Sequence, residues 1–399
     1  MARALLLLPA LMPATLCAQD IELSPLGETR LRYESVDQQG LSGGADALTL
    51  RVRAGAAASA DRWSALIEGQ AILAIIDDYF SGLGESAASP LIADPENIAL
   101  SRAQLRYAAQ RFAITAGRQR LAFDDERFVG SVGFRQSGQS FDAVRADIEP
   151  VQGVTAHIAY AWSVRTIWGI DGVGARQQAV SGDNLFGTLG AATPLGKLTA
   201  FAYLVDQDEP AVQDFRLSSQ SYGARLEGRQ KLGRAKIAYQ FSYARQSDWH
   251  RNPNRYAADY YLIDVGVDLG GPRMGAGYEV MGAGDGAALT SFQTPLATGF
   301  KFQGWADKFL VTPPDGVRDL YASAGWNWEA IGPLKAVTLQ AIYHDYRSDR
   351  MNRSYGEEID LLASAMLGRS TASLRFARYR ADGFATDTNK FWLQLDWII

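Results

Sequence analysis

Apolar and polar residues alternate with a period of two along most of this 399-residue chain. In the segment 29–35, Leu31 and Tyr33 lie on one face and Arg30 and Arg32 on the other. The same alternation appears in the segments 48–53, 102–107, 224–229 and 390–397. A period of two is typical of half-buried β-strands, whereas the period of about 3.6 that indicates helices is hard to find. The pattern therefore predicts an all-β protein.

The alternating segments are long, and the connections between them are of two kinds. Each segment covers about 10–14 residues, near the roughly 9–11 of a tilted membrane-spanning strand and above the roughly five or six of soluble sheets. Short turns are expected at 194–196, 232–234, 270–272 and 332–334. Longer polar loops are expected at 77–97, 168–183, 206–215 and 249–256. Short turns on one side and long loops on the other are typical of outer-membrane barrels.

The number of segments predicts one domain of about 18 strands, since a strand and its connection take roughly 20 residues. Alternation alone does not separate a membrane barrel from a soluble β-sandwich, because both have one apolar and one polar face. Aromatic residues near strand ends, such as Trp63, Trp162, Trp326 and Trp397, favour the barrel. We therefore expect a transmembrane antiparallel β-barrel with an apolar outer face and a charged lumen. A secreted ligand-binding sandwich stays open as an alternative.

The N-terminal residues 1–18 have the layout of a secretory signal peptide, because Arg3 precedes an apolar run and small residues follow up to Ala18. Cleavage there would leave 19–399 as the barrel and remove Cys17, so that no disulfide or thiolate metal site could form. We expect a protein of the Gram-negative outer membrane that contacts lipid and lipopolysaccharide. The last strand, with Trp397, resembles the signal that the barrel assembly machinery recognises.

The charged residues favour an anionic solute over nucleic acid. The chain has 39 basic and 44 acidic residues, without the basic excess of nucleic-acid binders. Seven of the 39 basic residues are lysine, so arginine, which makes two-pronged contacts with carboxylates, predominates. Arg102, Arg106 and Arg225 lie on the polar face of expected strands. Rings of arginine in a pore favour anions, and we expect these side chains to line the lumen.

The densest group of opposite charges lies in the stretch 117–148. Its members are Arg118, Arg120, Asp124, Asp125, Glu126, Arg127, Arg135 and Arg145. The adjacent acids are poorly placed for a glycosidase, whose two carboxyl groups lie on opposite sides of the sugar. The nearby arginines should keep these acids ionised, which is wrong for a general acid. A network of ion pairs at the narrowest part of a pore is the better interpretation.

An outer-membrane enzyme acting on lipid or polysaccharide is the alternative function. It would need a histidine or carboxylate dyad that converges inside the barrel. His157, His250 and His344 are far apart in the sequence and fall in different expected strands or loops. A metal site usually needs several ligands within reach of one another. The GAGDG run at 282–286 lacks the spacing of a phosphate-binding loop. We therefore expect no enzyme activity, no cofactor and no bound metal.

Two blocks of the sequence resemble the alginate export family of outer-membrane barrels. The first contains GRQRL, DDERFVG, VGFRQ and FDAVRA between residues 117 and 148, and the second is FQGWADKFLVTPPDGVRDLYASAGW at 302–326. The weaker strand pattern extends the resemblance over most of residues 20–399. The resemblance implies a monomeric barrel of about 18 strands whose arginine-rich lumen passes a polyuronate. It also implies that acidic residues and loops restrict the pore.

The family pattern, carried over to this chain, gives candidate site residues. The candidates for the constriction are Arg118, Arg120, Asp124, Asp125, Arg127, Arg135 and Arg145. A loop or plug element that folds inward would contain Trp305, Asp307 and Lys308, with Pro313 and Pro314. The expected function is passive diffusion or export of anionic or saccharide solutes, with a uronate polysaccharide such as alginate among the candidates. The solute and the direction of transport stay open.

Overall fold

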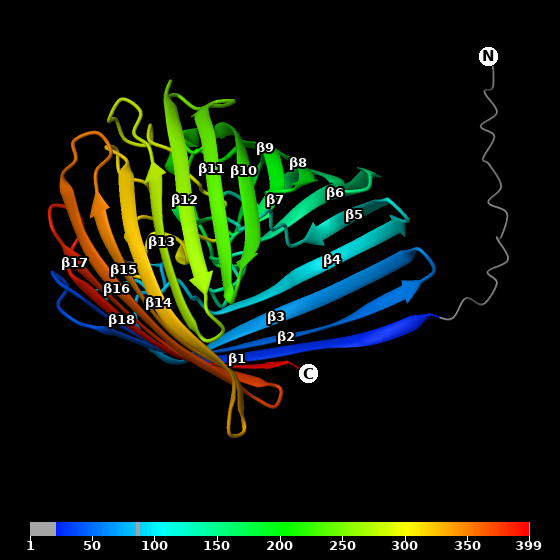
Figure 1. Cartoon of the computed structure of the whole chain (residues 1–399), viewed down its shortest axis with the longest axis horizontal. Helices are drawn as coiled ribbons and strands as arrows, with labels where there is room; N and C mark the ends of the chain where they lie inside the picture. Colours follow the sequence, from blue (N-terminus) through cyan, green and yellow to red (C-terminus); the bar gives the residue numbers. More distant parts are fainter. Residues whose placement is uncertain (1–20, 85–87, 399) are drawn as a thin grey trace, which may run out of the picture.

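Eighteen antiparallel strands form one closed sheet in the computed structural model, which describes residues 21–84 and 88–398. Figure 1 shows the strands arranged around a common interior, and the first strand pairs with both the second and the last. The expected all-β barrel of about 18 strands is therefore confirmed. The predicted signal peptide, 1–18, lies outside the described residues.

The strands follow one another around the barrel in sequence order. Their bounds are β1 Glu22–Gln38, β2 Ala45–Ala60, β3 Trp63–Asp78, β4 Asn97–Ala109, β5 Phe112–Gln119, β6 Ser140–Val151, β7 Val154–Arg165, β8 Ala179–Thr193, β9 Gly196–Val205, β10 Ser219–Leu232, β11 Ala235–Asp248, β12 Ala257–Asp268, β13 Pro272–Met281, β14 Val317–Ile331, β15 Leu334–Arg347, β16 Ser354–Leu367, β17 Ser370–Ala381 and β18 Thr388–Ile398. Helical structure in the described residues consists of three single 3-10 turns, η1 Gly174–Arg176, η2 Gln213–Phe215 and η3 Gly299–Lys301. No helix there is long and apolar enough to span a membrane.

The period-two pattern places charged residues inside and apolar residues outside. On β2, Arg51 is fully buried and Arg53 nearly so, whereas Val52 between them is 41% exposed. Leucine, isoleucine and aromatic side chains of most other strands are likewise exposed on the outer face. A soluble sandwich would show the reverse arrangement, so the outer surface is that of a barrel in lipid.

The connections differ at the two ends of the barrel. Every even-numbered strand up to β16 ends in a turn of two or three residues, including the predicted turns near 194–196, 232–234, 270–272 and 332–334. Every odd-numbered strand ends in a longer connection of at least six residues. Two of the predicted long loops overlap strands: 77–97 includes the last two residues of β3 and the first of β4, and the last residues of 168–183 belong to β8. Short turns face the periplasm and long loops the exterior in barrels of this type.

Two of the long loops, 120–139 and 282–316, fold into the barrel and pack against each other. Val129 forms a parallel bridge with Leu296, and the Thr298 amide donates to the carbonyl oxygen of Glu126 at 3.0 Å. Phe128 of the first loop and Phe292 of the second lie in one buried cluster with side chains of the inner wall. The interior therefore contains an apolar core that the two loops supply and that partly fills the barrel.

Candidate functional site: the barrel interior

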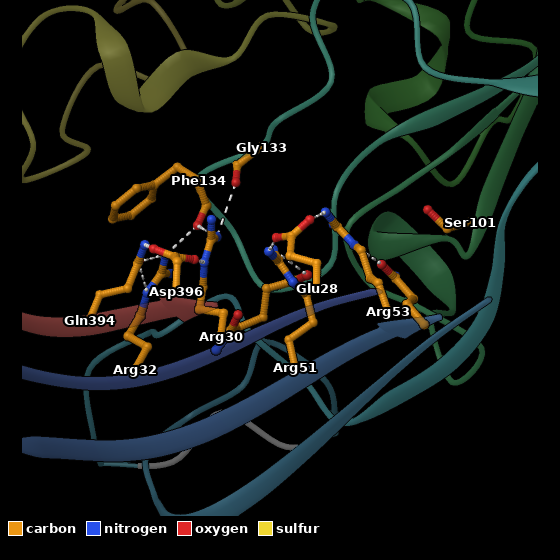
Figure 2. Close-up of polar contacts among 12 residues, drawn as sticks. Glu28, Arg30, Arg32, Arg51, Arg53, Ser101, Gly133, Phe134, Gln394 and Asp396 are labelled. Carbon is orange, nitrogen blue, oxygen red and sulfur yellow. Dashed lines mark hydrogen bonds and ion pairs between the residues drawn. The ribbon is translucent and has the colours of Figure 1, made fainter. Parts of the chain in front are cut away.

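Arginines of β1 and β2 fix loop 120–139 to the wall. The Arg30 guanidinium donates to the carbonyl oxygens of Gly133 at 3.1 Å and Phe134 at 3.0 Å, as Figure 2 shows. Arg32 also donates to the Phe134 carbonyl and forms a 3.1 Å ion pair with Asp94. Arg51 donates to the Arg135 carbonyl at 3.4 Å. A buried guanidinium has five donors to satisfy, so loop carbonyls are suitable partners.

Four carboxylates on β1 to β6 each form ion pairs with two arginines. The groups are Glu28 with Arg51 and Arg53, Glu68 with Arg102 and Arg120, Asp142 with Arg118 and Arg165, and Asp147 with Arg106 and Arg145. His157 also contacts Asp147, at 2.7 Å. Each group therefore carries at least one positive charge without a carboxylate of its own. We call these side chains, together with Arg30 and Arg32, the basic wall.

The three acids 124–126 do not pair with the arginines next to them in the sequence, which corrects our expectation. Asp125 forms a 2.7 Å ion pair with Arg225 of β10, and Glu126 forms one of 2.8 Å with Lys301 of the other inward loop. Asp124 accepts a hydrogen bond of 3.4 Å from the Tyr203 hydroxyl on β9 and lies 3.9 Å from Lys197. Because loop 120–139 crosses the interior, its acids contact the opposite side of the barrel.

The environment of Asp125 and Glu126 keeps both acids charged. Burial alone raises the pKa of Asp125, but the charge of Arg225 and a hydrogen bond from Gln240 offset it, so the pKa lies below its ordinary value. Burial likewise raises the pKa of Glu126, and hydrogen bonds from Lys301 and Thr298 bring it below its ordinary value. Both carboxyl groups are thus unsuited to act as general acids near neutral pH.

Asp307 connects loop 282–316 to loop 120–139 and to the wall. Its Oδ2 atom lies 2.6 Å from Arg135 and 3.0 Å from Lys390 of β18, and all three side chains are buried. Burial raises the pKa of Asp307, but Lys390 and Arg135 hold it below its ordinary value. Burial lowers the pKa of Arg135, and the charge of Asp307 more than offsets this, so its pKa is raised. Asp307 and Arg135 therefore stay ionised.

Arg127 joins the same loop to the far wall. It forms a 2.6 Å ion pair with Glu279 of β13, and both side chains are buried. The Tyr260 hydroxyl on β12 donates to the same carboxylate at 2.8 Å. Burial lowers the pKa of Arg127, and the charge of Glu279 offsets it, so its pKa lies above the ordinary value.

Sequence reasoning missed a row of acids on β12 to β16, which we call the acidic wall. It consists of Asp264, Glu279, Asp319, Glu358 and Asp360. Glu358 accepts a hydrogen bond from the Ala306 amide at 2.7 Å, and Asp360 accepts one from the Trp305 amide at 3.2 Å. Acids at alternate positions of one strand were the available signal, but the sequence gives no indication that they meet a loop from another part of the chain.

Three cavities follow one another from the loop end of the barrel to the turn end. The upper one, of about 450 Å³, is lined by Arg127, Arg135, Asp307 and Lys308 among others. It shares Phe302 and Gln303 with a middle cavity of about 380 Å³, which Asp125 and Trp305 also line. The middle cavity shares Asp264, Tyr321 and Ile342 with a lower one of about 520 Å³. Of the residues predicted for the plug element, Asp307 and Lys308 line the upper cavity and Trp305 lines the middle one.

Each histidine contacts an aspartate in the structure. His344 lies 2.9 Å from Asp319, and in the described residues no hydroxyl group forms a hydrogen bond with a histidine. At the loop end, His250 approaches Asp183 and Asp206, and one ligand atom from each lies within 4.8 Å of the others. The sequence separation of these three residues hid this grouping, which has the composition of a cation site. A convergent hydrolase dyad with a serine is not seen in the described ranges.

A closed 18-stranded barrel with an apolar outer face, short turns at one end and inward loops from the other defines the class of outer-membrane channels. The chain belongs to the alginate export family, since the family profile, described as alginate export, matches residues 23–359. It is accordingly a protein of the Gram-negative outer membrane. No curated protein matches the sequence.

Solved structures of outer-membrane porins share the fold. Acinetobacter baumannii OccAB4 superposes with a TM-score of 0.72 at 13% identity, covering 96% of this chain and 99% of that one. Pseudomonas aeruginosa OccK9 (OpdG) gives a TM-score of 0.71 at 14% identity, with 95% and 99% covered. A BenF-like porin from Pseudomonas fluorescens gives 0.69 at 13% identity, with 95% and 99% covered. At these identities the likeness establishes the fold alone.

Proposed function

We propose that this outer-membrane channel passes anionic solutes, uronate saccharides among them, along an arginine-rich lumen. The observation that supports the proposal is the sharing of carboxylates on the basic wall. Glu68, for example, lies 2.5 Å from Arg102 and 2.7 Å from Arg120, so the three side chains together carry one net positive charge. Four such groups on neighbouring strands form a positive surface that favours anions over cations.

The accessible arginines are the ones that would meet the solute. The side chains of Arg106, Arg120 and Arg102 are 40%, 28% and 23% exposed, whereas Arg32 and Arg51 are buried under loop 120–139. An exposed guanidinium that already holds one carboxylate has donors left for a second one. Contacts of this kind are individually weak, which allows a solute to move from one arginine to the next.

The test is a planar bilayer measurement with the purified protein. In a potassium chloride gradient, the sign of the reversal potential should indicate chloride preference over potassium. An oligouronate should interrupt the current at lower concentration than a neutral malto-oligosaccharide of the same length. Cation preference, or equal effects of the two saccharides, would refute the proposal while leaving the channel class intact.

A further inference from the structure

Strand β5 is too short to cross the apolar layer by itself. It has eight residues, Phe112–Gln119, and Figure 1 shows it as a short arrow between the longer strands β4 and β6. Eight residues extend over about 27 Å, and a tilt of about 40° reduces this to about 21 Å along the membrane normal. The apolar band of an outer-membrane barrel is about 25 Å tall. The wall therefore lacks part of one strand toward the loop end.

The edge of β4 is unpaired where β5 is missing. The β4–β5 ladder begins at Ala103 opposite Arg118, so residues 97–102 pair with β3 but not with β5. Gly117 lies one residue before the last β4–β5 pair, its φ is +110°, and a Cβ atom there would lie 2.3 Å from the Ala103 carbonyl oxygen, so the two backbones approach closely just before the break. The chain then enters loop 120–139 and leaves the wall.

The unpaired edge lies at a level where the outer surface is still apolar. On β4 itself, Ile98 is 67% exposed and Leu100 is 42% exposed. The last β3–β4 pair toward the loop end is Ile72 with Asn97. Leu73, the next residue of β3 in that direction, is 53% exposed. Unpaired backbone groups are not tolerated against hydrocarbon and require polar partners or water.

A cavity of about 180 Å³ lies beside the unpaired segment of β4, and Gly169 and Ile170 of the β7–β8 loop also line it. Its lining includes the buried Gln70 and Ser137 as well as Ile98 and Leu100, whose side chains are exposed on the outer surface. Such a volume holds several water molecules, at about 30 Å³ each. Arg118 supplies one direct partner, because its guanidinium donates to the Leu100 carbonyl oxygen at 3.2 Å.

We propose that the barrel is open sideways beside β5, and that this side opening binds the anionic headgroup of an amphiphile whose chain lies along Ile98 and Leu100. Arg118 and Arg165 both line the cavity, and both pair with Asp142, at 2.7 Å and 3.2 Å. One positive charge is thus left at the border between water and lipid, which suits a phosphate or carboxylate headgroup. The proposal is independent of which solute crosses the lumen.

The opening is tested by cysteine labelling in lipid vesicles, with single variants in a Cys17→Ser background. A membrane-impermeant maleimide should label L100C at least about tenfold faster than L105C, because a polar reagent does not enter hydrocarbon. Leu105 is also exposed on β4, but it lies in the paired ladder. L73C controls for depth, since Leu73 lies farther toward the loop end than Leu100. Equal labelling of L100C and L105C, or labelling of L73C as fast as L100C, would overturn the opening.

The ligand class is tested by fluorescence quenching of a dye attached to L100C. Vesicles with brominated phosphatidylglycerol should quench it at least about twofold more than vesicles with brominated phosphatidylcholine. Arg118→Gln and Arg165→Gln should each remove the difference, whereas Arg245→Gln, in an exposed ion pair with Asp259, should not. Because Arg165 is 34% exposed, Arg165→Gln should fold normally, and its result stands even if Arg118→Gln misfolds.

Added dodecyl phosphate distinguishes the two sources of such a headgroup. If it restores the fluorescence in phosphatidylglycerol vesicles, the site accepts free amphiphiles, and if it does not, the site is specific for membrane lipid. Either result supports an anionic headgroup site. Equal quenching by the two brominated lipids in the unmodified arginine background would overturn it.

Discussion

The basic wall and the acidic wall use the same alternation of residues but satisfy their charges differently. On the basic wall, each carboxylate is shared by two arginines, as Glu68 is by Arg102 and Arg120. On the acidic wall, Glu279 pairs with Arg127, but Asp264 and Glu358 accept hydrogen bonds from neutral groups, the Tyr321 hydroxyl at 2.7 Å and the Ala306 amide at 2.7 Å. The basic wall therefore carries more positive charge than the acidic wall.

The two walls hold the two inward loops in different ways. Arginines under loop 120–139 bind its carbonyl groups, while carboxylates of the acidic wall bind amides of loop 282–316. Backbone carbonyls need donors and backbone amides need acceptors, so each wall suits the part of the loop that it holds. A difference in charge between the two sides of an interior would also orient a solute that carries a dipole.

The largest effect is expected from separating the loops from the walls. Asp307→Asn removes the charge that Arg135 and Lys390 share, and loss of one partner in a buried ion pair costs about 3–5 kcal/mol. Loop 282–316 should then detach, with a larger and noisier single-channel conductance and faster hydrogen exchange in this loop. Asp345→Asn is the control, because its pair with Arg347 is exposed. A conductance trace like that of the unmodified protein would contradict this account of the loop.

A second prediction compares two substitutions within one group of the basic wall. Glu68→Gln leaves Arg102 and Arg120 without their carboxylate and should raise the chloride-to-potassium permeability ratio about twofold. Arg120→Gln should lower the ratio by a similar factor. Reversal potentials in a salt gradient measure both changes. Shifts in the same direction for the two variants would show that this group does not set selectivity.

On the acidic wall, a smaller change of the same sign as for Glu68→Gln is expected. Asp264 lines the middle and lower cavities, and Asp264→Asn should raise the chloride-to-potassium ratio by less than about twofold. The amide keeps an acceptor for the Tyr321 hydroxyl, so the fold should tolerate it. Asp259→Asn, whose carboxylate pairs with Arg245 outside these cavities, serves as control. A fall in the ratio would contradict the assignment of an acidic wall.

The smallest effect concerns pH. Burial, followed by the charge of Lys390, lowers the pKa of Lys308 to about 8, and this side chain lines the upper cavity. Its positive charge is present below that pH and lost above it, so anion preference should fall slightly between pH 7 and pH 9. Lys308→Met should show no such fall over this range. The pKa of Lys308 is lower in the folded state than in the unfolded chain. The cost of burying its charge is therefore largest below about pH 8, and the free energy of unfolding increases as pH rises above that value.

The sequence predicted the strands well because a period of two is a local property. Arg51 and Arg53 alternate with Val52, and the structure places them on opposite faces. The loop ends were also predictable, since turn residues at 232–234 and 332–334 stand out against the strands. The partners of the charges were not predictable. Asp125 binds Arg225, a hundred positions away, because its loop crosses the interior.

The length of β5 shows the same limit. The alternation around residues 112–119 indicates a strand, but only the register against β4 shows that pairing stops at Arg118, one residue after Gly117. By itself, the sequence determined which residues share a face of each strand, because successive side chains of a strand point to opposite sides. Together with the strand lengths and the two kinds of connection, this pattern predicted the barrel. The tertiary structure decided which charges meet, because inward loops bring together residues that no local pattern connects.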